Sequence, residues 1–165
     1  MTLDGWTIRR ATAEDADAIA AAHLDSIRSL GPAFYPDEHV ARWASGVTPA
    51  MYIQAMNGGE VFFVAIDQNV SEPVVLGFSS HWSDGTEDGV SVYVRGSAAR
   101  RGIGTALLRA AESQAVQTGS RSLVIEASLA GLDFYKANGF QPEGEPALLP
   151  GMQLLAVRMR KTIGG

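Results

Sequence analysis

The stretch that decides the fold runs from Val92 to Leu108 and reads VYVRGSAARRGIGTALL. It begins with a β-rich run and ends with apolar residues at helical spacing. Gly102 and Gly104 stand where the helical part begins, and the lack of side chains there lets another molecule approach the backbone. The first N–H groups of a helix have no partner within it, and the helix dipole adds partial positive charge. Together with Arg100 and Arg101, this turn predicts a binding site for a phosphate or diphosphate group.

The residues on both sides of this stretch predict a mixed order of strands and helices. We expect strands at residues 7–11, 61–66, 74–82, 89–94, 123–125 and 154–159, and helices at residues 13–29, 37–44, 49–56, 102–118 and 129–137. The β-rich runs between residues 61 and 94 have tight connections, which is typical of an antiparallel meander. The short apolar run at 123–125 is typical of a buried parallel strand. The sequence thus predicts one α+β domain over residues 1–165, with a core from about 7 to 161 and a mixed sheet.

The composition excludes several functional classes. Of the 165 residues, 46% are hydrophobic and 19% are charged, which is typical of a folded soluble protein. A formal net charge of −5 argues against a general nucleic-acid binder, because such proteins need a basic face to displace counterions. The chain has no cysteine and its three histidines lie far apart, so we expect no disulfide and no metal site. It shows neither an apolar stretch of the roughly 20 residues that span a bilayer nor a signal peptide, and we expect a cytoplasmic protein with no membrane partner.

Three kinds of nucleotide site could explain glycines before a helix. A P-loop needs a lysine directly after the glycine turn, where this chain has Thr105 and Ala106. A Rossmann dinucleotide site needs a third glycine, where this chain has Leu107. Glu126, at the next strand end, is the one feature in favour of a dinucleotide site, so that alternative stays open.

The third kind of site fits better. The stretch from Val94 to Leu108 strongly resembles the acetyl-CoA pyrophosphate loop of the GNAT superfamily of N-acetyltransferases, which reads Gln/Arg-x-x-Gly-x-Gly/Ala after the fourth strand. Ala99 stands where the family usually has Gln or Arg. A second segment, ASLAGLDFYKANGF at residues 127–140, is similar to the family's late Phe-Tyr-x-x-x-Gly-Phe motif, although many members have Asn in place of Ser128. The resemblance covers about Ile8 to Lys161.

The resemblance implies a mixed, mostly antiparallel central sheet of six to seven strands, flanked by helices and splayed between the fourth and fifth strands. It implies an acyltransferase that moves the acetyl group of acetyl-CoA directly to a primary amine of a small molecule or peptide, without a metal, nucleic acid or membrane. Homodimers are common in the family, so the resemblance also implies a possible homodimer. The implied acetyl-CoA contacts are Val92, Tyr93, Val94, Arg100, Arg101, Gly102, Ile103, Gly104, Thr105 and Ser128.

The same resemblance implies roles for individual side chains. Tyr135 is the implied general acid that protonates the departing sulfur. Asp88, at the start of the fourth strand, is the candidate base, although many members use no single base. Tyr35, Trp43 and Trp82 are candidate acceptor contacts. The alternative role is packing in the core for Tyr35 and Trp43, and a half-buried strand end for Trp82. Two other functions stay open, a non-catalytic acetyl-CoA-binding module and a dinucleotide-binding oxidoreductase.

Overall fold

The computed structural model of the chain describes residues 5–72, 74–150 and 153–164. Its α-helices are α1 (Ala16–Leu30), α2 (Asp37–Ser45), α3 (Pro49–Asn57), α4 (Ile103–Gln117) and α5 (Leu132–Ala137), and short 3-10 turns lie at Ala13–Asp15, Gly31–Ala33 and Gly96–Ala98. Its strands are β1 (Trp6–Arg10), β2 (Val61–Asp67), β3 (Val74–Ser83), β4 (Asp88–Val94), β5 (Ser122–Ser128), β6 (Gln141–Pro142), β7 (Ala147–Leu148) and β8 (Leu155–Thr162).

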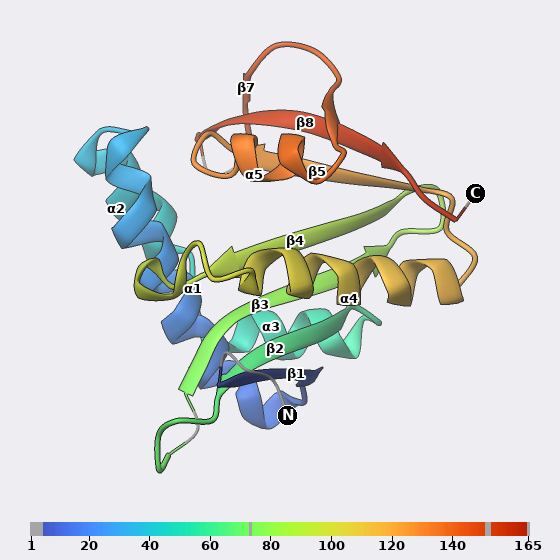
Figure 1. Cartoon of the computed structure of the whole chain (residues 1–165). Coiled ribbons are helices and arrows are strands. Elements are labelled where there is room, and N and C mark those ends of the chain that lie inside the picture. The colour runs from blue at the N-terminus through green and yellow to red at the C-terminus, as the bar shows by residue number, and fades with distance from the viewer. Residues whose placement is uncertain (1–4, 73, 151–152, 165) are drawn as a thin grey trace.

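Within the described residues, eight strands form one sheet in the order β1-β2-β3-β4-β5-β8-β6, and β7 pairs with β8. Neighbouring strands are antiparallel except β4 and β5, which are parallel and share one register pair, Gly89 with Val124. Beyond that pair the two strands diverge toward the end of β4 (Figure 1). The structure thus confirms a mixed sheet that splays between the fourth and fifth strands. It has more than six or seven strands because β6 and β7 are two residues each, too short to leave a periodic pattern in the sequence.

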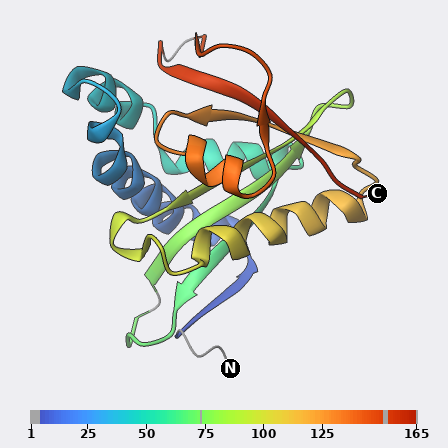
Figure 2. The ribbon, with the colours of Figure 1, turned by 45° about the horizontal axis from the view of Figure 1, so that its top comes forward.

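Helices cover both faces of the sheet (Figure 2). On one face, Val90 packs with Leu108 of α4 in a core cluster that also contains Tyr135 of α5. On the other face, Tyr93 packs against a cluster that contains Tyr52 of α3 and apolar residues of α1. Because side chains alternate along a strand, the even residues of β4 face α4 and the odd ones face α1 and α3. The opening between β4 and β5 therefore joins the two helical layers.

The helix expected at residues 129–137 begins only at Leu132. The main-chain donors before it have other partners: the N–H of Gly131 bonds the carbonyl oxygen of Ser128 at 3.0 Å and its Oγ at 3.2 Å, and the hydroxyl of Tyr35 accepts the N–H of Leu129 at 2.8 Å. These bonds hold a turn where the sequence pattern indicated a helix. Across the described ranges, no helix has both the length and the apolar character needed to cross a bilayer.

Candidate active site

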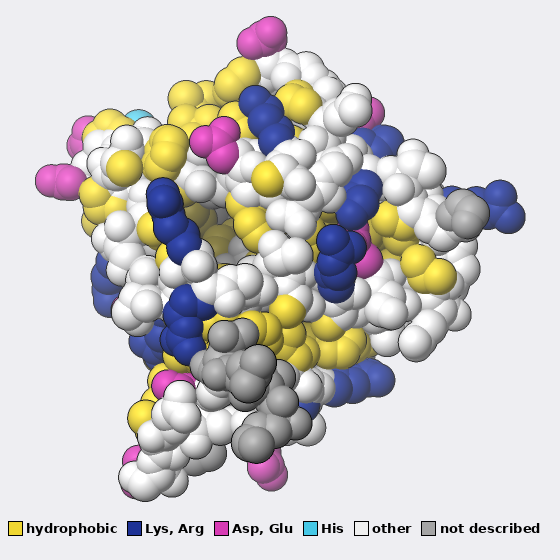
Figure 3. Space-filling view, in the orientation of Figure 1, with side chains coloured by type: hydrophobic (Ala, Val, Ile, Leu, Met, Phe, Trp, Pro, Cys, Tyr) yellow, Lys and Arg dark blue, Asp and Glu magenta, His cyan; other side chains and the backbone are white. Residues whose placement is uncertain are grey.

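A cavity of about 510 Å³ lies where β4 and β5 separate. Its lining comes from the segment before and at the start of α4 (Ala98, Ala99, Arg100, Gly102, Gly104, Thr105), from the two strands (Val92–Val94, Ile125–Ser128), from α5 and the turn before it (Ala130, Gly131, Asp133–Tyr135), and from α1, α2 and their connection (Ser26, Leu30, Gly31, Phe34, Trp43). Figure 3 shows the molecule hollowed on this face, with hydrophobic and basic side chains around the hollow.

One end of the cavity is the uncapped start of α4. Gly102 is the N-cap residue, with φ of +80°, and no side chain caps the helix there. The N–H of Ala106 is the first to bond one turn back, to the Gly102 carbonyl at 3.1 Å, so the three amides before it have no helical partner. Arg100 lines the same end and also has a positive φ, of 64°. Free amides, the helix dipole and a guanidinium together suit a phosphate or diphosphate group.

Tyr135 reaches from α5 to the main chain of β4. Its hydroxyl accepts the N–H of Val92 at 3.1 Å and donates to the Val92 carbonyl oxygen at 3.4 Å. Only 4% of Tyr135 is exposed. Burial raises the pKa of its phenol, the phenol of Tyr93 raises it further, and the bond to Val92 opposes both effects. Tyr135 is therefore a protonated phenol at neutral pH, placed at the wall of the cavity.

Alternate peptide groups of β4 face the opening in the sheet. The main-chain groups of successive strand residues point to opposite neighbours. Since the N–H of Val92 bonds Tyr135 on the β5 side, the groups of Tyr93 point toward β3 and those of Val94 point into the opening. Val94 thus presents a main-chain donor and acceptor to a molecule that lies there.

The structure brings most of the residues expected at the site to this one cavity. Those that line it are Val92, Tyr93, Val94, Arg100, Gly102, Gly104, Thr105, Ser128, Tyr135 and Trp43. Those that do not line it are Arg101, Ile103, Asp88, Tyr35 and Trp82.

Two of these departures come from the direction of side chains within one motif. Ile103 is 1% exposed and packs beside Leu107 on the buried side of α4, so only its main chain stays at the start of the helix. Arg101 is exposed but lies outside the lining, unlike its neighbour Arg100. Adjacent side chains at a helix start point in different directions. A sequence motif therefore includes both residues, although only one of them lines the cavity.

Asp88 lies at the far end of β4 from the cavity. It is four residues from Val92, roughly 13 Å along a strand. Its Oδ1 is 3.7 Å from Nε2 of the buried His81. Burial is the largest influence on the pKa of Asp88 and raises it, but hydrogen bonds from Ser120 and Ser83 and the adjacent His81 outweigh burial, so the pKa lies below its ordinary value. This position does not support Asp88 as the base for an amine in the opening.

Tyr35 and Trp82 contribute to packing. Tyr35 is 6% exposed, and its hydroxyl donates to the Leu155 carbonyl at 2.6 Å while it accepts the N–H of Leu129. Trp82 lies so close over Gly89 that a Cβ there would fall 2.2 Å from its ring. The alternative roles given above for these two aromatic residues are therefore the ones that the geometry favours.

Two further residues of the lining are Phe34, the neighbour of Tyr35, and Glu126, which sequence reasoning connected only with a dinucleotide site. Phe34 is 50% exposed and lines the cavity beside the connection from α1 to α2. Glu126 is the one exposed residue of β5, between the buried Ile125 and Ala127. A charged residue inside an otherwise apolar parallel strand is the signal that could have placed it at the opening.

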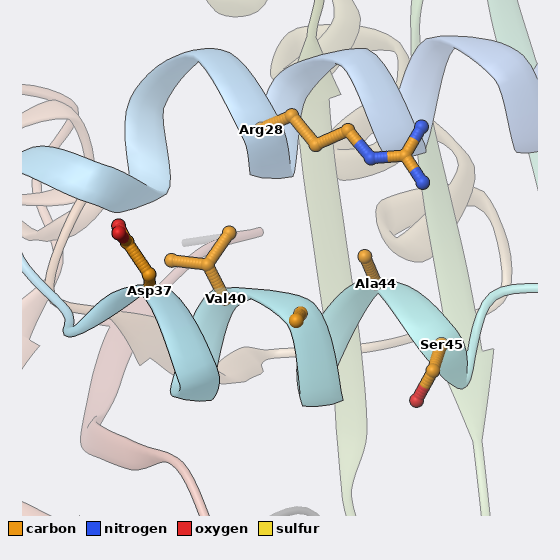
Figure 4. A pocket seen from close by; sticks show the side chains of 6 residues that line it. Arg28, Asp37, Val40, Ala44 and Ser45 are labelled. Carbon is orange, nitrogen blue, oxygen red and sulfur yellow. The ribbon is translucent and has the colours of Figure 1, made fainter.

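A second hollow, of about 330 Å³, lies between α1 and α2. Figure 4 shows Arg28 on α1 above the groove and Asp37 at the start of α2, with Val40 and Ala44 between them. This hollow has one cation and one anion on apolar walls and no group of convergent donors. Within the described residues, no group of three or more histidine or acidic side chains could hold a metal ion.

Comparison with known families matches residues 58–142 to the family described as Acetyltransferase (GNAT) domain. The matched segment contains the meander, all of α4 and β5, and α5. It therefore includes the two strands that separate and the Gly102 turn at the start of α4, which is the anion end of the cavity. Comparison with curated protein sequences gave no match.

Solved structures share this fold over nearly its whole length. A GCN5-related N-acetyltransferase (aminotransferase, class II) from Rhodopseudomonas palustris is 26% identical, with a TM-score of 0.81 and 99% of each chain covered. The PaiA N-acetyltransferase of Thermoplasma acidophilum, in complex with coenzyme A, is 18% identical, with a TM-score of 0.76, and the match covers 99% of this chain and 100% of that one. YncA of Salmonella typhimurium, a putative acetyltransferase with its cofactor acetyl-CoA, is 21% identical, with a TM-score of 0.69 and coverage of 95% and 93%.

Proposed function

Because the chain belongs to the GNAT family of N-acetyltransferases, we propose that it transfers the acetyl group of acetyl-CoA to a primary amine of a small molecule or peptide. We also propose that residues 1–165 act as one acetyltransferase domain. The observation that carries the proposal is the cavity itself, because an uncapped helix start that suits a diphosphate and a protonated phenol line the same opening in the sheet.

Acetyl-CoA suits the cavity on chemical grounds. Its diphosphate needs main-chain donors and positive charge, which the Gly102 turn and Arg100 supply. Its pantetheine arm carries amide groups that can pair with a strand edge, and Val94 presents main-chain groups in the opening. Gly104 keeps the approach open, because a Cβ there would lie 3.0 Å from the ring of Phe134. Two of the structural relatives named above are described as complexes with coenzyme A or acetyl-CoA.

The two faces of the sheet separate the two substrates. The anion end belongs to α4, on the face that Val90 and Val92 pack against. The other half of the lining belongs to α1 and α2, on the face of Tyr93. Acetyl-CoA on the α4 face and an amine on the α1–α2 face would meet at the opening between β4 and β5.

The reaction forms a C–N bond and breaks the C–S bond of the thioester. An ammonium group must lose one proton before its nitrogen can attack, and the nitrogen loses a second one as the amide forms. The sulfur leaves as a thiol if a proton reaches it. Tyr135 is a protonated donor at the cavity wall, and in this proposal it supplies that proton and regains one from the nitrogen through solvent.

Titration calorimetry and a thiol-release assay test the proposal together. We expect acetyl-CoA to bind and NAD not to bind, and we expect primary amines to release thiol from acetyl-CoA. Binding of acetyl-CoA without thiol release for any amine would favour the non-catalytic module, and binding of NAD in its place would favour the oxidoreductase.

A further inference from the structure

We propose that the part of the cavity on the α1–α2 face is an acceptor subsite for a primary amine carried on an aromatic or branched apolar group, and that Glu126 receives its ammonium group at the opening. This inference rests on the proposed acetyl transfer. It assigns the acceptor class and the carboxylate that Asp88 does not supply.

The register of the sheet places Glu126 beside the reacting region. Gly89 and Val124 are the pair at which β4 and β5 still meet. Two residues further along each strand come Ser91 and Glu126, so Glu126 stands across the opening from the stretch that leads into Val92. The peptide group of Val92 is the one that bonds the phenol of Tyr135.

Strand alternation directs the Glu126 side chain to the acceptor side. Its neighbours Ile125 and Ala127 are buried in the cluster that packs on α4 and α5. Glu126 therefore points to the opposite face, which α1 and α2 border. Asp133, the other carboxylate in the lining, belongs to α5 and so to the face of α4. The phenol of Tyr135 and the carboxylate of Glu126 thus approach the opening from opposite faces of the sheet.

Charge around Glu126 favours a cation. Its Oε1 accepts a hydrogen bond from Arg158 at 3.2 Å, and Arg158 also pairs with Glu87 and Glu143. Arg160 pairs with the same two carboxylates, so Glu87 and Glu143 are each paired with two arginines, whereas Glu126 is paired with Arg158 alone and is the least neutralised of the three. Of the three glutamates, Glu126 alone lines the cavity. In the described residues no hydrogen bond reaches its Oε2, which leaves that oxygen for an ammonium group.

Apart from Ser26 and Gly31, the remaining wall of the subsite is apolar and aromatic. Leu30, Phe34, Trp43 and Tyr93 line it, and the rings of Trp43 and Tyr93 lie edge to face with centroids 6.4 Å apart. The exposed half of Phe34 is surface that an apolar substituent would remove from water. A second ammonium group, as in a diamine, would meet these rings without a carboxylate partner. The lining therefore favours an arylalkylamine over a polyamine.

Each proton that moves in this step has a donor and an acceptor. The ammonium gives one proton to the Glu126 carboxylate, which passes it to solvent. The neutral nitrogen then bonds to the acetyl carbon while the C–S bond breaks and the sulfur takes the proton of Tyr135. The second nitrogen proton leaves to solvent, from which the phenol is restored.

Glu126→Gln and the matched control Glu87→Gln test the carboxylate. Both changes remove a partner of Arg158, but Glu87 does not line the cavity. With phenethylamine as probe, we expect Glu126→Gln to lower kcat/KM about a hundredfold at pH 7. The ratio of wild-type to variant kcat/KM should fall about tenfold for each pH unit up to 9, because the variant can use only amine that is already neutral and this fraction rises with pH. Glu87→Gln should change kcat/KM less than about threefold. A loss that is constant with pH, or equal in the two variants, would overturn the role of Glu126.

Phe34→Ala and the control Val116→Ala test the acceptor class. Val116 is 46% exposed on α4 and does not line the cavity, so it matches Phe34 in exposure. We expect wild type to prefer phenethylamine over putrescine by at least about tenfold in kcat/KM, and Phe34→Ala to raise the KM for phenethylamine about five- to tenfold with an unchanged KM for acetyl-CoA. A higher kcat/KM for putrescine than for phenethylamine would overturn the proposed acceptor class. Thiol release with other primary amines but not with phenethylamine would also overturn it. Absence of acetyl-CoA binding, or of thiol release with any primary amine, would instead overturn the proposed function.

Discussion

The hydroxyl of Tyr135 and the main-chain N–H of Val92 lie 3.1 Å apart and join α5 to β4 where the sheet opens. Without this contact, a peptide group of β4 would face the opening with no protein partner. The phenol thus replaces a missing strand at one residue, and it does so with the same oxygen that the proposed reaction needs as a proton donor. Structure and chemistry at this position are therefore coupled, and a single substitution should affect both.

Tyr135→Phe should lower kcat about a hundredfold, because the departing sulfur loses its proton donor. The free energy of unfolding should fall by about 1–2 kcal/mol, because the partly buried N–H of Val92 loses its partner. The affinity for acetyl-CoA, measured by calorimetry, should change less than about threefold. Equal turnover in the two proteins would remove Tyr135 from the mechanism.

Arg100→Gly should separate stability from cofactor binding. Arg100 has a φ of 64°, a left-handed conformation that costs a residue with a Cβ about 1 kcal/mol and costs glycine little. We expect urea unfolding to show a gain of up to about 1 kcal/mol, and calorimetry to show at least about fivefold weaker binding of acetyl-CoA. A glycine in place of another arginine, such as Arg109, would disturb α4 itself. The control is therefore Arg100→Lys, which keeps the positive charge. Unchanged affinity in Arg100→Gly would argue against a role of the guanidinium at the anion end.

Stability should fall in mild acid because of His23. Burial lowers the pKa of His23 to about 4, and its Nδ1 lies 2.6 Å from the hydroxyl of Tyr52. Tyr52 and Tyr93, which pack against it, have raised pKa values and stay neutral. Above pH 6.5 both the folded and unfolded chains hold neutral His23. Between pH 6.5 and about 4 only the unfolded chain gains the proton, so the free energy of unfolding should fall by up to about 3 kcal/mol.

Urea unfolding at pH 8, 6 and 4.5 measures this dependence. His23→Asn should flatten it, whereas the control His39→Asn, at a partly exposed position on α2, should leave it as in wild type. An equally steep dependence in His23→Asn would assign the acid sensitivity to other groups.

Tyr35→Phe should destabilise the protein without changing the recognition of the acceptor. The hydroxyl joins Leu129 and Leu155, and its loss leaves an N–H and a carbonyl oxygen without their partner. We expect the free energy of unfolding to fall by about 1–3 kcal/mol and the KM for phenethylamine to stay within about twofold at 25 °C. A large change in that KM at full folding would return Tyr35 to the acceptor site.

The local signals in the sequence were reliable where the chemistry is local. The glycines before α4 define a helix start by themselves, so the anion end could be predicted from Gly102 and Gly104. Tyr135 was also found from its motif. The strands between residues 61 and 94 were predicted within one or two residues, because alternation and turn residues are properties of neighbouring positions.

Signals that depend on distant segments failed. Leu129 to Gly131 read as helix because nothing nearby shows that Tyr35, 94 residues away in the sequence, binds the N–H of Leu129. Asp88 was a candidate base from the resemblance, and its distance from the opening depends on where β5 leaves β4, which the sequence does not show. Phe34 and Tyr35 are adjacent, and only the packed connection between α1 and α2 decides which of them lines the cavity.

The sequence by itself determined the order of elements and the start of the helix after Gly102, since both follow from spacing and backbone freedom within a few residues, whereas Tyr135 was indicated by the resemblance of its segment to a family motif. The tertiary structure alone decided where the sheet opens, which face each strand residue points to and which carboxylate reaches the opening. Those outcomes depend on strand register and on packing between segments that are far apart in the sequence, and no local pattern encodes either.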